Sequence, residues 1–163
     1  MSLSTPAGKS TRSKFVPLDL CSPVNSAILS NLSHEDAMEI NNLTHAIIGC
    51  AFKVHSVLGS GFLEKVYENA LKIELGKLHI DARQQKELQV WYEGYAVGTY
   101  YADLWIDGQL IIEVKAVQNL TKQHELQLVH YLTATNVDNG LLINFGATVE
   151  VRRKFRQYKP KRI

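Results

Sequence analysis

Two charged residues, Glu113 and Lys115, stand in the otherwise apolar run LIIEVKAVQ at residues 110–118. The run has the composition of a β-strand, and residues two apart on a strand point to the same face of the sheet. Ile112, Val114 and Ala116 would therefore face the other way. Burying two charges without partners costs free energy, so Glu113 and Lys115 need either a partner or a chemical role.

A third charged residue, Asp103, lies among apolar neighbours in YYADLWI, the strand that we expect immediately before this one. The Asp-Gly pair at 107–108 is a strong hairpin signal between the two strands. A two-residue loop would set Asp103 opposite Ile112, whereas a three-residue loop over 107–109, or a β-bulge, would set it opposite Glu113 on the same face. We predict the longer loop or a bulge.

Asp103, Glu113 and Lys115 would then have the composition of a phosphodiesterase site. Two carboxylates about 5 Å apart on neighbouring strands repel each other unless a cation lies between them. Mg²⁺ takes one or two carboxylates and completes its shell with water and substrate phosphate. A neighbouring lysine can orient a water or stabilise negative charge that develops on phosphorus. The alternative is a structural salt bridge on a half-exposed face.

The first half of the chain predicts two helices. SHED at 33–36 resembles a capping box with Ser33 as N-cap, and the apolar spacing continues that helix to about Leu58. GSG at 59–61 ends it, and a second helix follows from Phe62 to about Lys77. Neither of these glycines belongs to a phosphate-binding loop, because no strand precedes them.

The second half predicts five strands and one helix. Alternating residues favour strands over 86–92 and 95–106, joined by a turn at Glu93-Gly94, before the strand at 110–118. A helix capped by Thr121 follows, then the apolar strand NGLLINFG and the alternating strand TVEVRRKF. The order α-α-β-β-β-α-β-β indicates an α/β domain with a mixed sheet. An antiparallel meander leads through a crossover helix to a fourth strand that we expect to be parallel.

Charge is distributed unevenly along the chain. The last twelve residues hold seven Lys or Arg and no acid, whereas residues 34–151 hold 8 basic and 15 acidic residues. An acidic body with a basic end suggests contact with a polyanion, so we name Arg152, Arg153, Lys154 and Arg156 as candidate nucleic-acid-binding residues. The alternative is a solvated tail that aids solubility.

Composition also bounds the location and the domains. Cys21 and Cys50 have no metal-ligand or redox spacing, and no apolar run could span a bilayer, so we expect a cytoplasmic protein without membrane contact. Residues 1–33 are rich in Ser, Thr, Pro and Asn and predict a disordered or loosely packed extension. The domain would occupy 34–156, with a basic tail at 157–163.

Four blocks of the sequence resemble, in order, the GxxExxY family of the PD-(D/E)XK nuclease superfamily. They are AFKVHSVLGSGFLEKVYENAL, YYADLWIDGQLIIEVKAV, HELQLVHYL and GLLINFG. GFLEKVY at 61–67 matches the signature that names the family. The resemblance implies a restriction-endonuclease-like core over about 34–156. One departure is Ala102, which stands in the place of the superfamily's proline.

This resemblance implies roles for individual residues. Asp103 and Glu113 match the two acidic metal ligands, with the Val114 carbonyl as a further ligand, and Lys115 matches the catalytic lysine. Glu64 matches an additional acidic residue near the metal, and Gln127 a polar position that helps to place water or phosphate. The implied protein is a nuclease dependent on Mg²⁺ or Mn²⁺ that hydrolyses phosphodiester bonds in nucleic acid, with DNA favoured.

Three further residues are candidates for support of the site. Tyr67 follows Glu64 by three residues on the same helical face and could hydrogen-bond a catalytic carboxylate or the phosphate, although such a tyrosine is more often a core residue. His55 lies close to the glycine turn and is interpreted mainly as a packed histidine. Tyr131 is four residues after Gln127 and could line the same groove. Glu68 is interpreted as a solvated helix charge.

Two other classes of protein remain open at this point. One is a non-catalytic nucleic-acid- or protein-binding module that retains the nuclease fold. The other is an interaction domain that uses exposed aromatic residues such as Trp91 and Tyr95, for which a homodimer is one arrangement. A zinc protease site is excluded, because the histidines of HELQLVH are six residues apart instead of four.

Overall fold

A computed structural model describes the backbone of residues 26–106 and 108–156, and the side chains from Glu39 on. Its contacts divide the chain between Asp36 and Ala37, and each part is described by itself. The expected tail at 157–163 and most of the expected extension lie outside the described residues. Along the described residues, no helix combines the length and apolarity needed to cross a membrane.

The elements follow the predicted order. They are α1 (Ser26–Leu58), α2 (Glu64–Lys77), β1 (Arg83–Tyr92), β2 (Tyr95–Ile106), β3 (Leu110–Lys115), α3 (Lys122–Thr135), β4 (Asn139–Phe145) and β5 (Val149–Phe155). Thr121 caps α3 as predicted, because its side chain accepts a hydrogen bond from His124 N. The α/β class with one mixed sheet is confirmed.

The start of α1 differs from the prediction. The helix begins at Ser26, so Ser33 lies inside it and is not its N-cap. SAILSNL at 26–32 contains neither Pro nor Gly, so nothing in that stretch breaks a helix. The SHED pattern was therefore a misleading capping signal, and residues 26–33 are helical where an irregular extension was expected.

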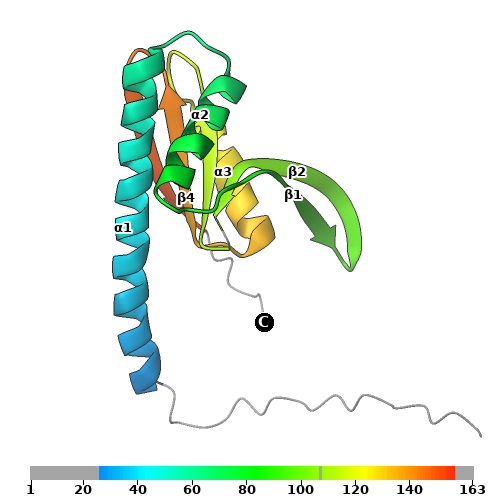
Figure 1. Ribbon diagram of the computed structural model, residues 1–163. Helices are drawn as coiled ribbons and strands as arrows, with labels where there is room; N and C mark the ends of the chain where they lie inside the picture. The colour runs from blue at the N-terminus through cyan, green and yellow to red at the C-terminus, as the bar shows by residue number, and fades with distance from the viewer. Residues whose placement is uncertain (1–25, 107, 157–163) are drawn as a thin grey trace, which may run out of the picture. The chain divides into compact units, whose positions relative to one another are not determined.

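The sheet has the order β1-β2-β3-β4-β5. β1, β2 and β3 form the antiparallel meander, β3 and β4 are parallel as predicted, and β5 returns antiparallel to β4. Figure 1 shows that the hairpin of β1 and β2 curves away from β3 and β4. The tight turn at its end has positive φ at both Glu93 and Gly94, as a two-residue hairpin turn requires.

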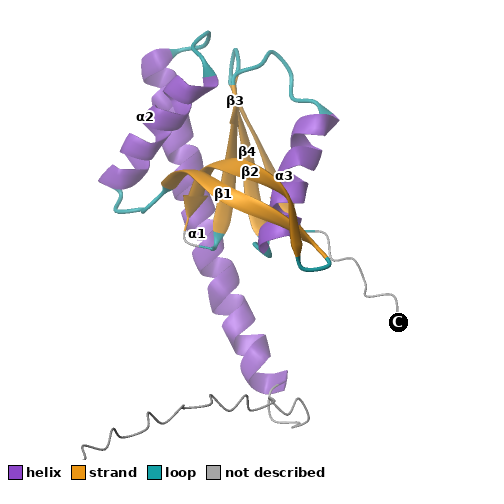
Figure 2. Cartoon of the chain, turned by 90° about the vertical axis from the view of Figure 1, so that its right-hand side faces the viewer, coloured by secondary structure: helices purple, strands orange, loops and turns teal. Residues whose placement is uncertain are grey.

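Helices cover both faces of the sheet (Figure 2). One core, the α1/α2 face, includes Ile47, Leu71, Ile112 and Leu141. The other, the α3 face, includes Ile111, Leu128, Leu132 and Leu142. Because β3 is buried on both sides, its apolar run does not alternate with polar residues, and the two charges in that run lie in the interior of the domain.

The side of β2 that faces each core changes at Asp103. Ala102 is buried in the α3 face, whereas Leu104, two residues later, is buried in the α1/α2 face. Residues two apart on a regular strand point the same way, so β2 twists sharply between them. Opposite this point on β1, Gln85 has a φ of 51°, a left-handed conformation that few non-glycine residues adopt. The irregularity places the Asp103 side chain between the two cores.

Tyr67 fixes the turn between α1 and α2. Its hydroxyl donates to Gly59 O at 2.8 Å and accepts from Phe62 N at 3.2 Å. Its ring stacks on Phe145, with centroids 4.5 Å apart. Both hydrogen-bonding capacities of the hydroxyl are therefore used by the turn, which supports the interpretation of Tyr67 as a core residue and not a reacting group.

Replacing Tyr67 by Phe should lower the free energy of unfolding by about 1–2 kcal/mol, because two hydrogen bonds are lost and the stacked ring is kept. Urea denaturation would measure the change. Tyr95→Phe is the matched control, since Tyr95 is 75% exposed on the hairpin and should leave stability unchanged. Equal stabilities of the two variants would show that the hydroxyl does not hold the turn.

Candidate active site

Asp103, Glu113 and Lys115 meet where β2 separates from β3. The two strands pair as Leu104–Ile112, Trp105–Ile111 and Ile106–Leu110, so three residues, 107–109, connect them. This is the register of the predicted longer loop, and its continuation sets Asp103 opposite Glu113. Instead of a further ladder bond, Val114 N donates to Asp103 Oδ2 at 2.9 Å. The Asp103 side chain thus replaces the backbone partner that β3 loses.

Glu113 is the most constrained charge of the site. The residue is 2% exposed, and Lys115 Nζ donates to its Oε1 at 2.7 Å. Its other oxygen, Oε2, is buried and has no hydrogen-bond partner among the described residues. Burial, followed by the charge of Asp103, raises the pKa of Glu113 from its ordinary 4.5 to about 7, although Lys115 opposes the shift and Glu64 adds to it. A buried carboxylate oxygen without a hydrogen-bond partner is unusual and calls for an explanation.

The pKa values of the other two groups follow from the same cluster. Burial raises the pKa of Asp103, the hydrogen bond from Val114 N opposes this, and the charge of Glu68 adds to it. Burial also favours the neutral amine of Lys115, but the carboxylate of Glu113 outweighs it and the pKa of Lys115 is raised. Lys115 is therefore held as an ammonium ion beside two carboxyl groups whose pKa values are raised.

Helix α2 brings two more carboxylates to this end of β3. Glu64, the first residue of the helix, accepts a hydrogen bond from Ala116 N at 3.3 Å. Glu68, one turn later, is 3% exposed, so its interpretation as a solvated charge is wrong. Lys65 donates to its Oε1 at 2.8 Å, and Gln84 donates to the same oxygen at 2.9 Å. The side chain is therefore part of a buried polar network.

Gln85 links this network to Asp103. Its Nε2 donates to Glu68 Oε2 at 3.1 Å and to Asp103 Oδ1 at 3.2 Å. One amide group thus separates two carboxylates that would otherwise repel each other. Glu68 was interpreted from the sequence as a solvated charge, and Gln85 was not among the candidate residues. The spacing of Glu68 from Glu64 was a usable signal for the first, but nothing in the sequence marked Gln85.

Helix α3 lies beside the same charges. Gln127 Nε2 donates to the Tyr131 hydroxyl at 2.7 Å, so the two residues share one surface as expected. Burial raises the pKa of Tyr131, and the charges of Glu113, Lys115 and Asp103 also act on it. The Tyr131 ring lies 5.5 Å from the ring of Tyr100 on β2. Tyr131 therefore links α3 electrostatically to the carboxylate pair.

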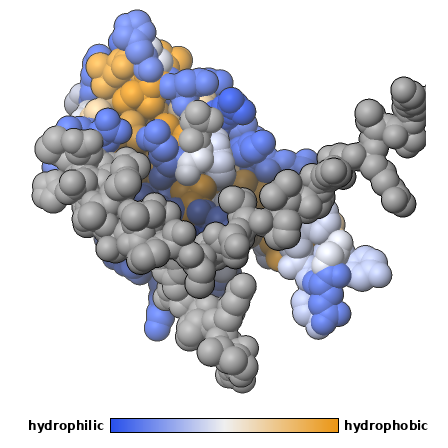
Figure 3. Space-filling model, turned by 90° about the horizontal axis from the view of Figure 1, so that it is seen from below, coloured by the Kyte–Doolittle hydropathy of each residue, from blue (hydrophilic) through white to orange (hydrophobic). Residues whose placement is uncertain are grey.

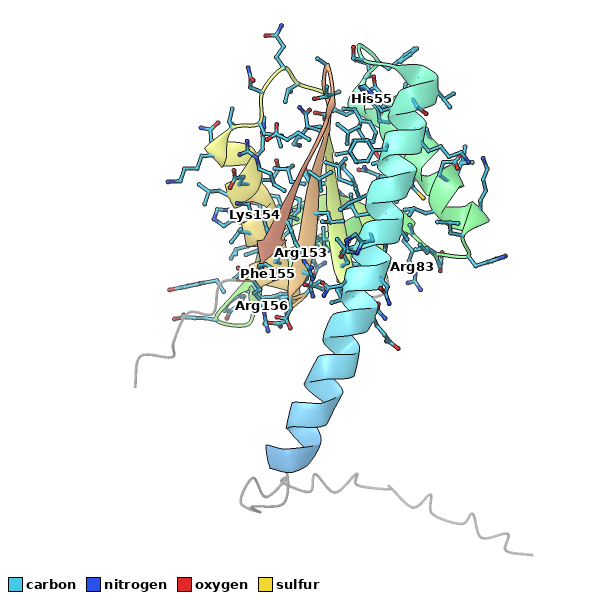
Figure 4. All side chains as sticks on the ribbon, turned by 90° about the vertical axis from the view of Figure 1, so that its left-hand side faces the viewer. His55, Arg83, Arg153, Lys154, Phe155 and Arg156 are labelled. Carbon is cyan, nitrogen blue, oxygen red and sulfur yellow. The ribbon has the colours of Figure 1, made fainter. Side chains whose placement is uncertain are left out.

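His55 on α1 and Tyr67 on α2 have structural partners. His55 Nε2 is 2.9 Å from Gly146 O, which ties α1 to the β4–β5 turn. Figure 4 shows His55 near the end of α1, away from the labelled residues of β5. Both residues are thus engaged in packing contacts, and neither has a described hydrogen bond to Asp103, Glu113 or Lys115.

The candidate nucleic-acid-binding residues, three on β5 and Arg156 directly after it, have intramolecular partners. Arg152 and Lys154 both bind Glu125 of α3, and Arg152 also binds Glu150. Alternation along the strand separates them from Arg153, which donates to Asn41 and Asn139. Figure 4 shows Lys154 toward α3 and Arg153 toward α1. The Arg156 guanidinium forms an ion pair with Asp138.

These contacts give β5 a structural role, since its cations hold the strand to helices on both faces. A phosphate would have to compete with carboxylates already in contact. The assignment of the four residues to nucleic-acid binding stays a prediction.

Comparisons with known proteins define the class to which this arrangement belongs. The family model described as PD-(D/E)XK nuclease superfamily matches residues 41–157, which contain the sheet, α2, α3 and the carboxylate cluster. The chain belongs to the PD-(D/E)XK nuclease superfamily. Among curated proteins, none matches it.

The chain is also similar to part of a solved structure. That structure is described as the crystal structure of SSO0001, and it has 19% sequence identity and a TM-score of 0.45. The match covers 58% of this chain and 50% of that one. The chain thus corresponds to about half the length of that protein.

Members of this superfamily generally use divalent metal ions. Among the described residues, no three His, Cys, Asp or Glu side chains come together in a group that could hold a metal ion. A hard cation such as Mg²⁺, however, is usually bound by one or two carboxylates and keeps several waters. Asp103 and Glu113 supply such a pair, and Glu113 Oε2 is a buried oxygen without a partner.

The raised pKa of Glu113 gives a test of this site in cation-free buffer. Between about pH 4.5 and pH 7 the folded protein binds the proton of Glu113 more tightly than the unfolded chain does. The contribution of Glu113 to the free energy of unfolding therefore falls as pH rises through this window. Glu113→Gln removes the titration, so its stability relative to wild type should increase by about 1–3 kcal/mol between pH 5 and pH 8.

Urea denaturation at several pH values would measure this difference. Glu87→Gln, an exposed carboxylate on β1, is the control and should follow the wild type at every pH. A constant difference between Glu113→Gln and wild type would contradict the burial argument.

Gln85 should act on cation affinity through Asp103. Gln85→Asn keeps a residue that tolerates positive φ but shortens the side chain, so the link between Glu68 and Asp103 is lost. We expect Mn²⁺ binding about 10- to 100-fold weaker by isothermal titration calorimetry, the usual effect of removing a group that orients a ligand. Gln89→Asn, on the same strand, is the control, because Gln89 bonds only to Glu87 among the described contacts. Unchanged affinity in Gln85→Asn would exclude the positioning role.

Proposed function

We propose that this protein is a divalent-metal-dependent nuclease that hydrolyses phosphodiester bonds in nucleic acid, with Mg²⁺ or Mn²⁺ as cofactor and DNA as the favoured substrate. Membership of the superfamily supports the nuclease class. The observation that carries the proposal is the convergence of Asp103, Glu113 and Lys115, in which a buried carboxylate oxygen is left without a partner. In a purely structural salt bridge the second carboxylate oxygen, when buried, would usually accept a hydrogen bond as well.

Asp103 and Glu113 would hold the cation, with the Val114 carbonyl and Glu64 as additional oxygen donors. When bound, the cation would lower the pKa of a water molecule and offset charge on the scissile phosphate. The hydrogen bond from Val114 N fixes the direction of the Asp103 carboxylate. The contact between Glu64 and Ala116 N keeps the end of α2 close to β3.

Lys115 would act as a hydrogen-bond donor. Because its pKa is raised, the ammonium cannot accept a proton from the attacking water. It can donate to that water or to a phosphate oxygen, and so orient the first or neutralise the second. The contact with Glu113 holds Nζ in place before the substrate arrives. The proton of the water passes to another acceptor, such as solvent or a phosphate oxygen.

We also propose that the chain belongs to the GxxExxY group within the superfamily. Gly61, Glu64 and Tyr67 support it, since each has a local role. Gly61 has a φ of 104°, Glu64 contacts β3, and Tyr67 fixes the turn. The three residues would hold the start of α2 against the carboxylate cluster.

A cleavage assay on single-stranded and duplex DNA and RNA would test the nuclease proposal. With Mg²⁺ or Mn²⁺ we expect cleavage that EDTA abolishes. Lys115→Ala, Glu113→Gln and Asp103→Asn should each lower the rate at least about 100-fold, as removal of one charge-stabilising group does in other enzymes. Glu87→Gln is the control and should retain full activity. Failure to cut any substrate with either cation would favour a module that binds nucleic acid without cutting it.

A further inference from the structure

Two hollows lie between α3 and the hairpin of β1 and β2. Their volumes are about 300 Å³ and about 560 Å³, and both are lined by Tyr100 and His130. The two hollows therefore adjoin each other at these residues, and we call the pair the aromatic groove and define it by Trp91, Tyr100, Gln127, His130 and Tyr131. Figure 3, which is coloured by hydropathy, shows a mixed surface. Tyr and Trp have intermediate hydropathy, so colouring by hydropathy does not mark the groove, and its lining residues define it.

A β-bulge gives the groove its aromatic wall. Val90 pairs with Gly98, whereas Trp91 pairs with Ala96, so the register changes between these neighbours. Consecutive strand residues normally face opposite sides, but here both Val90 and Trp91 line the groove. Trp91 remains 61% exposed and Tyr100 remains 47% exposed, so both rings present surface that a ligand can cover.

The lining has the chemistry of a surface for uncharged aromatic rings. Among the described residues that line the two hollows there is no Asp, Glu, Lys or Arg. The rings of Trp91 and Tyr100 offer stacking surfaces, and Gln127 and His130 offer hydrogen-bonding groups. Nucleobases combine a flat aromatic face with a polar edge, and proteins that bind single strands stack bases on such side chains.

One residue of the groove, Tyr131, lies near the candidate active site. Tyr131 lines the groove, and the charges of Glu113, Lys115 and Asp103 act on its hydroxyl. Tyr100 lies on β2 three residues before Asp103, and its ring lies 5.5 Å from that of Tyr131. A strand whose phosphate reached Lys115 would therefore have its adjacent nucleotides beside the groove.

We propose that the aromatic groove binds unpaired bases of a single-stranded segment next to the phosphate to be cut, an inference that rests on the proposed nuclease function. Bases in a duplex have both faces covered by their neighbours, so they cannot stack on Trp91 or Tyr100 without being unpaired. The substrate class is therefore single-stranded nucleic acid, or a duplex with an unpaired end or flap.

Binding can be measured without cleavage, by fluorescence anisotropy of labelled oligonucleotides with the full chain in EDTA. We expect single strands to bind at least about 10-fold more tightly than a blunt duplex of equal length. Trp91→Ala and Tyr100→Ala should each weaken single-strand binding about 5- to 100-fold, the range for loss of one stacked base. Trp91→Phe should restore most of the affinity, because Phe keeps a stacking face.

Tyr92→Ala and Tyr95→Ala are the matched controls. Both side chains are exposed on the same hairpin, at 64% and 75%, but neither lines the groove. They should bind single strands like wild type. A second readout is tryptophan fluorescence, since the chain has two tryptophans and only Trp91 lies in the groove. Single strands should quench it, and the quenching should disappear in Trp91→Phe although binding persists.

Equal affinity for duplex and single strand, or equal effects of Trp91→Ala and Tyr92→Ala, would overturn the proposal. So would a dimer, detected by analytical ultracentrifugation, that Trp91→Ala dissociates, because a second copy would then occupy the groove. Cleavage with no preference for single strands would leave the nuclease proposal standing and remove this one. Single-strand binding through Trp91 without any cleavage would remove the nuclease proposal and leave the groove as a site that binds unpaired bases without cutting.

Discussion

The hydrogen bond from Val114 N to Asp103 Oδ2 is the interaction on which the site depends. Where β2 turns away from β3, a buried backbone donor of β3 loses its strand partner, and an unpaired buried N–H is costly. A carboxylate satisfies that donor and, by doing so, is held directly beside Glu113. The same departure of β2 explains the switch of its buried side between Ala102 and Leu104 and the left-handed backbone of Gln85. The departure of β2 from β3 therefore determines both the local backbone geometry and the position of the carboxylate pair.

Much of the arrangement of Asp103, Glu113 and Lys115 was predictable from the sequence. Burial makes the register of a strand specific, so two charges in LIIEVKAVQ and one in YYADLWI could be aligned by asking which loop length puts them on one face. The predicted three-residue connection is the one found. The parallel β4 followed from its continuous apolar run, because a strand buried on both faces does not alternate.

The residues that the sequence analysis missed depend on contacts distant along the chain. Glu68 looks like an ordinary helix charge until β1 covers it, and its partners Gln84 and Gln85 are 16 and 17 residues away. The cations of β5 looked free because Glu125, which binds Arg152 and Lys154, lies on a different element. Charge counts along a sequence cannot tell a solvated run from one that is paired across the fold. The predicted start of α1 was wrong for a different reason. The capping pattern SHED lies inside the helix and does not mark its beginning.

Three deviations from regular β-structure lie along one hairpin, and each coincides with a proposed functional role. Gln85, with its left-handed backbone, separates two carboxylates. The twist at Asp103 places the carboxylate that we propose as a metal ligand between β2 and β3. The bulge at Trp91 turns an aromatic ring toward α3. Each deviation costs stability, and such costs persist where surrounding contacts enforce them. Only the bulge at Trp91 changes the pairing register, which is the same on either side of Gln85 and Asp103. One hairpin thus carries both Asp103 of the candidate active site and Trp91 of the aromatic groove.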